Sequence, residues 1–171
     1  MRTGFPRQDA RDDFDRARRR AFLAKLAGWL RGRPSSWNRL PVLGEVTTLT
    51  SASAGGSGTR RLEYERICRL GPTNQEMVPI DQIVGTIEPT MCFDRRFRPT
   101  SELPRARFER VAADVLSGCG MEPVELCQCD DSYYVLDGHH RIAVARALGE
   151  RSVWAIITQV RLNQTGVPNT G

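Results

Sequence analysis

Long apolar runs, lysine and histidine are scarce in this sequence of 171 residues. No run approaches the roughly 18 consecutive apolar residues that a membrane-spanning helix needs, so we expect no span. Residues 1–5 contain no apolar signal core, which predicts a cytoplasmic protein without a secretion signal. The hydrophobic share of 40% is too high for a wholly disordered chain.

Lysine is nearly absent, because Lys25 is the only lysine among 25 basic residues. The basic charge is uneven along the chain. Residues 1–39 hold 11 basic and 4 acidic side chains, a net charge of +7, and residues 40–171 hold 14 basic and 16 acidic ones, a net charge of −2. These two values add up to the formal net charge of +5. The basic character therefore belongs to the N-terminal segment, and the rest does not have the composition of a basic nucleic-acid-binding domain.

The cysteines number five, an odd count in a chain for which no secretion signal is expected. We interpret them as reduced thiols. Cys127 and Cys129 place two thiols on one strand face, but no second cysteine pair supplies the other two ligands of a zinc site. The sequence therefore predicts no metal centre.

Residues 1–33 are predicted to form a basic amphipathic helical arm, helical over 9–31. Asp9 or Asp12 can cap its start, and Gly32 can end it. Apolar residues recur at helical spacing and form one stripe: Phe22, Leu23, Leu26, Trp29 and Leu30. The opposite face carries Arg16, Arg18, Arg19, Arg20 and Lys25.

This arm has three interpretations. Its stripe can dock on the domain or on a partner protein, leaving the basic face solvated. Alternatively, residues 12–33 can contact the phosphate backbone of DNA. The third interpretation is a helix lying on a membrane surface.

The remaining chain divides by composition. Residues 34–76 are rich in proline, glycine and serine and are predicted to be a linker, partly disordered. Residues 77–161 are predicted to form the compact domain, followed by a disordered tail over 162–171. The expected elements of the domain are strands over 78–80, 123–129, 132–136 and 152–160 and helices over 105–116 and 139–148.

The strongest chemical signal is the run Asp137, Gly138, His139, His140 and Arg141, placed between a predicted strand and a predicted helix. Glycine permits a sharp turn, and the helix behind it directs unpaired N–H groups and the positive end of its dipole into that turn. Such a turn binds anions. Arginine adds a fork of donors suited to phosphate oxygens, and the two histidines can donate further hydrogen bonds.

Two other features bear on this turn. Asp137 can cap the helix, hold a histidine tautomer or coordinate a metal ion carried by a nucleotide. The arginine-rich loop over 94–98 can close over the same site, where Arg95 would contact a phosphate; the other interpretation is a solvated loop.

These residues resemble the ParB/sulfiredoxin superfamily. The similarity lies in YYVLDGHHRIAVARALG at 133–149, in VPIDQIV at 78–84, which is similar to the opening strand and helix of that family, and in PVEL at 123–126. It covers about 77–160 and implies an α+β fold, a small mixed sheet with packed helices. The label "ParB-like nuclease" often given to such domains names a fold and warrants no activity.

The resemblance implies different roles for the turn in different branches. Sulfiredoxins have a catalytic cysteine where this chain has His139, so sulfiredoxin activity is not expected. ParB proteins of the segregation type have a Gly-Glu-Arg-Arg turn that holds CTP, where this chain has residues 138–141. Free serine kinases of this fold share the motif at 137–141, which implies ADP or ATP phosphates on this turn and makes Asp137 a candidate catalytic carboxylate. Glu88 is the nearest candidate for their second carboxylate, the general base.

The sequence thus predicts a nucleotide-binding module, with CTP or ADP/ATP and an accompanying Mg²⁺ on residues 138–141. It would regulate, or associate with, DNA or a partner protein. The alternative is an enzyme, either a small-molecule phosphotransferase or a nucleotide hydrolase, that uses Asp137 and Glu88. A nuclease would need two acidic residues placed for metal, of which Asp137 is the only good candidate.

Overall fold

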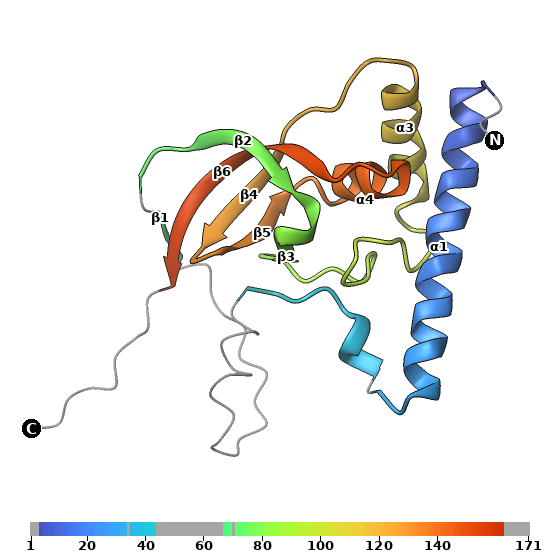
Figure 1. Cartoon of the computed structure of the whole chain (residues 1–171), viewed down its shortest axis with the longest axis horizontal. Helices are drawn as coiled ribbons and strands as arrows, with labels where there is room; N and C mark the ends of the chain where they lie inside the picture. Colours follow the sequence, from blue (N-terminus) through green and yellow to red (C-terminus); the bar gives the residue numbers. More distant parts are fainter. Residues whose placement is uncertain (1–3, 34, 44–66, 70, 163–171) are drawn as a thin grey trace, which may run out of the picture.

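The computed structural model of the chain describes residues 4–33, 35–43, 67–69 and 71–162. Most of the predicted linker, over 44–66, and all but the first residue of the predicted tail lie outside the described residues. The described part is an α+β structure in which a mixed sheet and three α-helices lie side by side (Figure 1). The predicted fold class is confirmed at this level.

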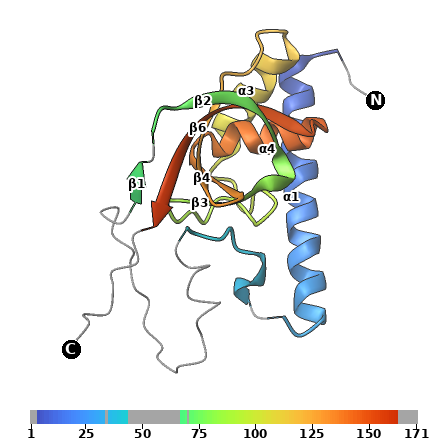
Figure 2. The ribbon, with the colours of Figure 1, turned by 60° about the vertical axis from the view of Figure 1, so that its left-hand side comes forward.

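The sheet has six strands in the order β1–β6–β4–β5–β3, with β2 also paired to β6. The strands are β1 (Ile67–Arg69), β2 (Asn74–Pro79), β3 (Ile83–Thr86), β4 (Val124–Cys129), β5 (Ser132–Asp137) and β6 (Ser152–Leu162). The pairs β3–β5 and β4–β6 are parallel and the others are antiparallel. The sheet curves strongly, so that β2 and β6 arch over β4 (Figure 2).

The strands expected from the alternating pattern are present. β4 and β5 form the predicted hairpin, whose turn places Asp130 at a φ of 53°. The segment after Pro79 differs from the family resemblance, which implies a helix there. A single 3₁₀ turn, η3 (Ile80–Gln82), leads directly into β3. Ile80 and Ile83 are buried, whereas Asp81, Gln82 and Val84 are exposed, so this segment has the burial pattern of a turn followed by a strand.

Three α-helices cover one side of the sheet: α1 (Pro6–Leu30), α3 (Arg105–Leu116) and α4 (His139–Leu148). α4 lies beside the sheet, α3 packs on α4, and α1 packs along α3 on the outside (Figure 1). The bounds of α3 and α4 are those predicted from the sequence. None of the helices in the described ranges combines the length and the apolar character that crossing a bilayer requires.

The start of α1 differs from the prediction that Asp9 or Asp12 caps it. The helix begins at Pro6, and the carbonyl oxygen of Phe5 accepts bonds from the N–H groups of Gln8 and Asp9. Proline favours the first helical position because its φ is fixed and it has no N–H to satisfy. The predicted end is confirmed, since the helix stops at Leu30 and Gly32 follows with a φ of 66°.

The face by which α1 docks also differs from the prediction. The apolar stripe is exposed, with Phe22 65% and Trp29 71% exposed. The buried face instead carries small residues, one phenylalanine and two aspartates: Ala10, Ala17, Ala21, Gly28, Phe14, Asp9 and Asp13. Small side chains let α1 approach its neighbours closely, and Phe14 meets Phe108 of α3 edge to face at 5.3 Å between ring centroids. The larger apolar residues were therefore misleading as a guide to the docked face.

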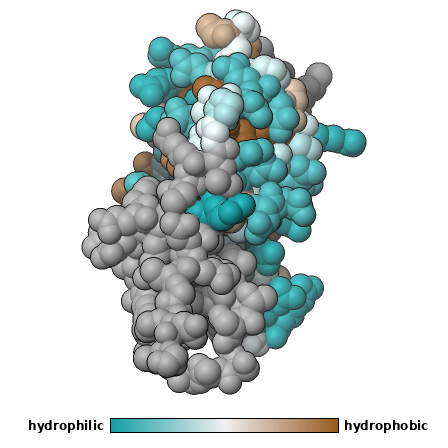
Figure 3. Space-filling view, turned by 90° about the vertical axis from the view of Figure 1, so that its left-hand side faces the viewer, coloured by the Kyte–Doolittle hydropathy of each residue, from teal (hydrophilic) through white to brown (hydrophobic). Residues whose placement is uncertain are grey.

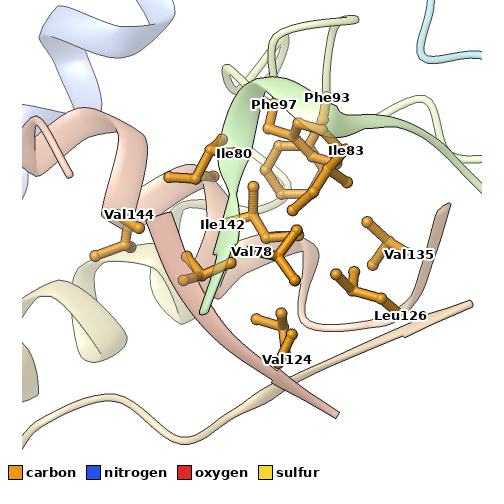
Figure 4. Close-up of a cluster of buried hydrophobic side chains, with 14 of the residues drawn as sticks. Val78, Ile80, Ile83, Phe93, Phe97, Val124, Leu126, Val135, Ile142 and Val144 are labelled. Carbon is orange, nitrogen blue, oxygen red and sulfur yellow. The ribbon is translucent and has the colours of Figure 1, made fainter. Parts of the chain in front are cut away.

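The main core lies between the sheet, α3 and α4. Its centre is formed by β-branched and leucine side chains from β2, η3, β3, β4, β5 and α4, and by two phenylalanines from the loop before α3 (Figure 4). The labelled side chains are Val78, Ile80, Ile83, Phe93, Phe97, Val124, Leu126, Val135, Ile142 and Val144. Away from α1, the described surface seen in Figure 3 is mostly hydrophilic.

Residues 35–43 belong to this compact unit, although the composition assigns them to a linker. They begin with a short 3₁₀ helix, η1 (Ser35–Asn38), and continue through isolated bridges of Arg39 with Asp94 and of Val42 with Thr86. Leu40 is only 1% exposed. The segment thus joins α1 to the core, so the N-terminal helix is part of the folded unit.

Gly28 sets the distance between α1 and η1. A Cβ at this position would lie 2.0 Å from Nε1 of Trp37, far inside contact distance. Alanine normally stabilises a helix relative to glycine. We nevertheless expect Gly28→Ala to lower the free energy of unfolding by about 1–3 kcal/mol, because Trp37 must move away. Chemical denaturation measures this change.

The control is Gly28→Ala combined with Trp37→Leu, which removes the colliding ring. The loss caused by Gly28→Ala should shrink in that background, which gives a coupling between the two positions. Additive effects of the two substitutions would contradict the contact.

Candidate functional site

The turn between β5 and α4 is built around Gly138. Its φ is 110°, a conformation that residues with a side chain rarely adopt. A Cβ here would also lie 2.8 Å from Cγ1 of Val124 on β4. Glycine is therefore required twice, by the backbone conformation and by the close approach of the neighbouring strand.

The first turn of α4 presents backbone donors. The first backbone hydrogen bond of the helix is donated by the N–H of Ile142 to the carbonyl of Gly138, at 3.0 Å. Among the described residues, no acceptor is bonded to the N–H groups of His139, His140 and Arg141. Asp137 does not cap the helix, because no side chain bonds to these donors. The glycine turn and the unbonded N–H groups expected from the sequence are thus present, and anion binding by them stays a prediction.

These donors border a cavity of about 760 Å³, which we call the turn groove. Its walls are the 137–141 turn, the exposed side of α3, and the segments 90–93 and 119–122. α3 contributes Arg107 and Arg110, both exposed, in addition to Arg141 of the turn. Three carboxylates also line the groove, those of Asp114, Glu122 and Asp137.

His139 is held between the sheet and a phenylalanine. Its Nε2 lies 2.8 Å from Oγ1 of Thr86, and its ring stacks on Phe93 at 6.1 Å between centroids. Burial lowers the pKa of His139 below its ordinary value, and the charges of Asp137 and Glu88 oppose this shift only in part. The imidazole is therefore neutral at pH 7.

His140 has a more strongly lowered pKa, about 4. Burial is the largest cause, and the positive charge of Arg107 adds to it. Its ring meets Phe93 edge-on at 5.2 Å. At neutral pH this side chain offers the groove an uncharged imidazole, which an approaching anion would help to protonate.

Arg141 is already engaged with the protein. Its guanidinium donates to the carbonyl of Pro123 and to the carboxylate of Asp137. The side chain of Arg141 is 15% exposed, whereas that of Asp137 is 56% exposed. The arginine is thus fixed in orientation at the groove, and Asp137 remains accessible beside it.

Two predicted site residues lie elsewhere. Glu88 is exposed and is not part of the groove wall, although its charge acts on His139. Arg95 lines a second cavity, next to α1. The loop over 94–98, predicted to close over the turn, contributes no residue to the wall of the turn groove; the residues before it, Cys92 and Phe93, do. Arg95 is therefore not a residue of the turn groove.

Sequence reasoning missed the contribution of α3. Arg107, Arg110 and Asp114 recur at i, i+3 and i+7 on one face of a helix whose other face buries Phe108 and Ala112. That spacing predicts a common polar face, but only the packing of α3 against α4 shows that this face borders the turn. Thr86, the partner of His139, carried no signal in the sequence.

No group of three or more histidine, cysteine, aspartate or glutamate side chains in the described ranges is arranged to hold a metal ion. Cys127 is fully buried, and burial raises the pKa of its thiol to about 12. It is therefore protonated at neutral pH and is a poor ligand or nucleophile.

Comparisons with known proteins give no relative for this arrangement. No protein-family model, curated protein or solved structure matches the chain. The site is therefore interpreted from its own geometry.

The lowered pKa of His140 predicts that the stability of the fold depends on pH. The folded protein binds fewer protons than the unfolded chain between pH 6.5 and about 4, so stability rises with pH across this window and is lost as the pH falls. In His140→Gln, which stays neutral, this part of the pH dependence should disappear. Denaturation at several pH values measures it.

The quantity to compare is the difference in unfolding free energy between the wild type and the variant at each pH. The carboxylates contribute to the pH dependence of both proteins, so their effect cancels in this difference. The stability of the wild type relative to the variant should be constant above pH 7 and should fall as the pH drops below 6.5. Parallel curves throughout would show that His140 titrates with an ordinary pKa.

Proposed function

We propose that the turn groove binds the phosphate groups of a nucleotide and that the protein is a nucleotide-binding module. The observation that carries this proposal is the set of unbonded N–H groups of His139, His140 and Arg141 at the border of a large cavity. Backbone N–H groups at the start of a helix, together with its dipole, favour a phosphate at this position.

The side chains around the turn support the same ligand. Arg107 and Arg110 are exposed and have no ion pair with any described residue. They line the groove from α3, whereas the N–H groups belong to α4, so two elements would contact an oligophosphate. A cavity of about 760 Å³ is also within the size range of small-molecule sites.

Asp137 supports a nucleotide that carries Mg²⁺. Magnesium in nucleotide sites commonly takes one or two carboxylates from the protein and its other ligands from phosphates and water. Asp137 is the accessible carboxylate next to the phosphate-binding donors. It would hold the ion, which would neutralise phosphate charge.

We further propose that the domain has a fold of the ParB/sulfiredoxin type. The support is the order of its parts, a strand, a glycine turn and a helix that presents the motif, beside a small mixed sheet. Together with the resemblance of 133–149, this order favours CTP or ADP/ATP as the nucleotide.

For the partner proposed for residues 12–33, the side chains favour a protein over DNA. Arg16 and Arg18 form ion pairs with Asp13 and Glu102, so part of the basic face is already neutralised. Phe22 and Trp29 are largely exposed, and such apolar side chains suit a protein surface better than a phosphate backbone.

Titration calorimetry with CTP, ATP and ADP, each with Mg²⁺, tests the proposal. We expect one of them to bind, and Arg107→Gln/Arg110→Gln to weaken its affinity by about tenfold or more through lost charge-assisted bonds. Arg141→Ala should abolish binding, but it also removes the contact with Pro123. The α3 pair is therefore the cleaner variant.

The matched control is Arg7→Gln/Arg161→Gln, which removes two exposed arginines that do not line the groove and changes the net charge equally. It should bind like the wild type. Equal affinities of the control and the α3 pair, or binding of none of the three nucleotides, would refute the proposal.

A second candidate function is phosphoryl transfer to a small molecule. It is favoured by one observation, that Asp137 and Glu88 both act electrostatically on His139, so two carboxylates lie near one imidazole. If the protein is such an enzyme, Asp137→Asn should reduce turnover by a much larger factor than it weakens nucleotide affinity, because Asp137 would act on the reacting phosphate as well as on the bound Mg²⁺. Chromatography of Mg-ATP or Mg-ADP incubated with free serine measures this. A nucleotide that binds and is recovered unchanged identifies a binding module.

A further inference from the structure

A second cavity, of about 380 Å³, lies between the end of α1, η1 and the 95–98 loop. Five arginines line it, and no acidic residue of the described ranges does: Arg31, Arg33, Arg95, Arg96 and Arg98. We call this cavity the arginine pocket. None of its lining residues belongs to the wall of the turn groove.

The buried carboxylate of Asp94 gives the loop its shape. It is 1% exposed and accepts bonds from the N–H groups of Arg96 and Arg98, at 2.9 and 3.0 Å. The N–H of Phe97 donates to the Asp94 carbonyl at 2.8 Å, and Phe97 has a φ of 55°. The N–H groups of Arg96, Phe97 and Arg98 are thus used within the loop, which is held in one conformation.

The same carboxylate neutralises one arginine only. Arg98 donates to Asp94 through Nε at 2.9 Å and forms an ion pair with it at 2.7 Å. Another guanidinium nitrogen of Arg98 donates to the carbonyl of Arg20 on α1 at 3.1 Å, and the N–H of Arg95 donates to the carbonyl of Asn38 at 2.9 Å. The loop is therefore fixed to α1 and to η1.

The other four arginines are not neutralised within the described structure. No carboxylate among the described residues pairs with Arg31, Arg33, Arg95 or Arg96. Arg33 lies over the ring of Trp37 at 4.7 Å, a contact that orients its guanidinium and leaves its charge in place. Four like charges around one cavity repel one another unless an anion lies between them.

The side chains of Arg31 and Arg33 are not needed to cap the C-terminal end of α1. The carbonyls of Gly28 and Trp29 accept bonds from the N–H groups of Arg31, Gly32 and Arg33, at 2.9–3.1 Å. Backbone bonds therefore satisfy carbonyl groups in the last turn, and the guanidinium groups of Arg31 and Arg33 are left for another role.

We propose that the arginine pocket is a second anion site, which binds a compact group carrying several phosphate charges. Guanidinium groups match phosphate oxygens in charge and in bidentate geometry, and an oligophosphate brings enough charge to offset four of them. The group comes either from a free oligophosphate or from the backbone of a nucleic acid strand. The site does not depend on nucleotide binding in the turn groove.

The test is titration of the full chain with inorganic tripolyphosphate, read by calorimetry and by the NMR signal of the Trp37 indole N–H. Trp37 lines the pocket, and its signal is assigned with Trp37→Phe. We expect binding to shift this signal. Arg95→Gln/Arg96→Gln should weaken the affinity at this site by about tenfold or more and remove the shift.

Two variants separate this site from the turn groove. Arg107→Gln/Arg110→Gln should leave the Trp37 shift and its affinity unchanged, even if it removes a second binding event. Arg7→Gln/Arg161→Gln controls for the loss of two positive charges and should also keep the shift. If nucleotides fail to bind the groove while tripolyphosphate still shifts Trp37, only the proposed function fails.

A second arm uses a short single-stranded DNA without a terminal phosphate. A Trp37 shift by this DNA that requires Arg95 and Arg96 and weakens steeply with salt identifies a nucleic acid backbone as the source. A shift by tripolyphosphate alone identifies a free oligophosphate. The proposal is overturned if tripolyphosphate leaves the Trp37 signal unmoved, or if Arg95→Gln/Arg96→Gln binds it like the charge control.

Discussion

The buried carboxylate of Asp94 is the interaction on which both cavities depend. By taking two N–H groups and the guanidinium of Arg98, it folds residues 94–98 into a tight loop. One side of that region packs Phe93 and Phe97 into the core and against His139. The other side directs arginines towards α1. A buried charge with several bonded partners is costly to disrupt. The loop therefore keeps its phenylalanines in the core and its arginines directed towards α1.

The two cavities use positive charge differently. In the turn groove, three arginines share their surroundings with three carboxylates and two histidines of lowered pKa, so the local charge depends on the ligand and on pH. No acidic side chain of the described residues lines the arginine pocket, and the buried Asp94 carboxylate is already bonded to Arg98. The first arrangement suits a ligand that brings its own cation and the second a bare polyanion.

The sequence predicted the elements whose burial follows a regular period. The helix over 139–148, the β4–β5 hairpin and the glycine turn were found where expected, because local turn chemistry and core packing agree there. The docked face of α1 was mispredicted, since close packing selects alanine and glycine over larger apolar residues. Arg107 was not assigned to a cavity and Arg95 was assigned to the wrong one, because a cavity's lining depends on which elements pack together over long sequence separations.

The loop before α3 belongs to the wall of both cavities, with Cys92 and Phe93 on one side and Arg95 and Arg96 on the other. The Asp94 carboxylate already holds residues 94–98 in one conformation, so filling either cavity has nothing in this segment left to order. A shared wall that is rigid beforehand separates two neighbouring cavities energetically, and an occupant of one is then not sensed by the other.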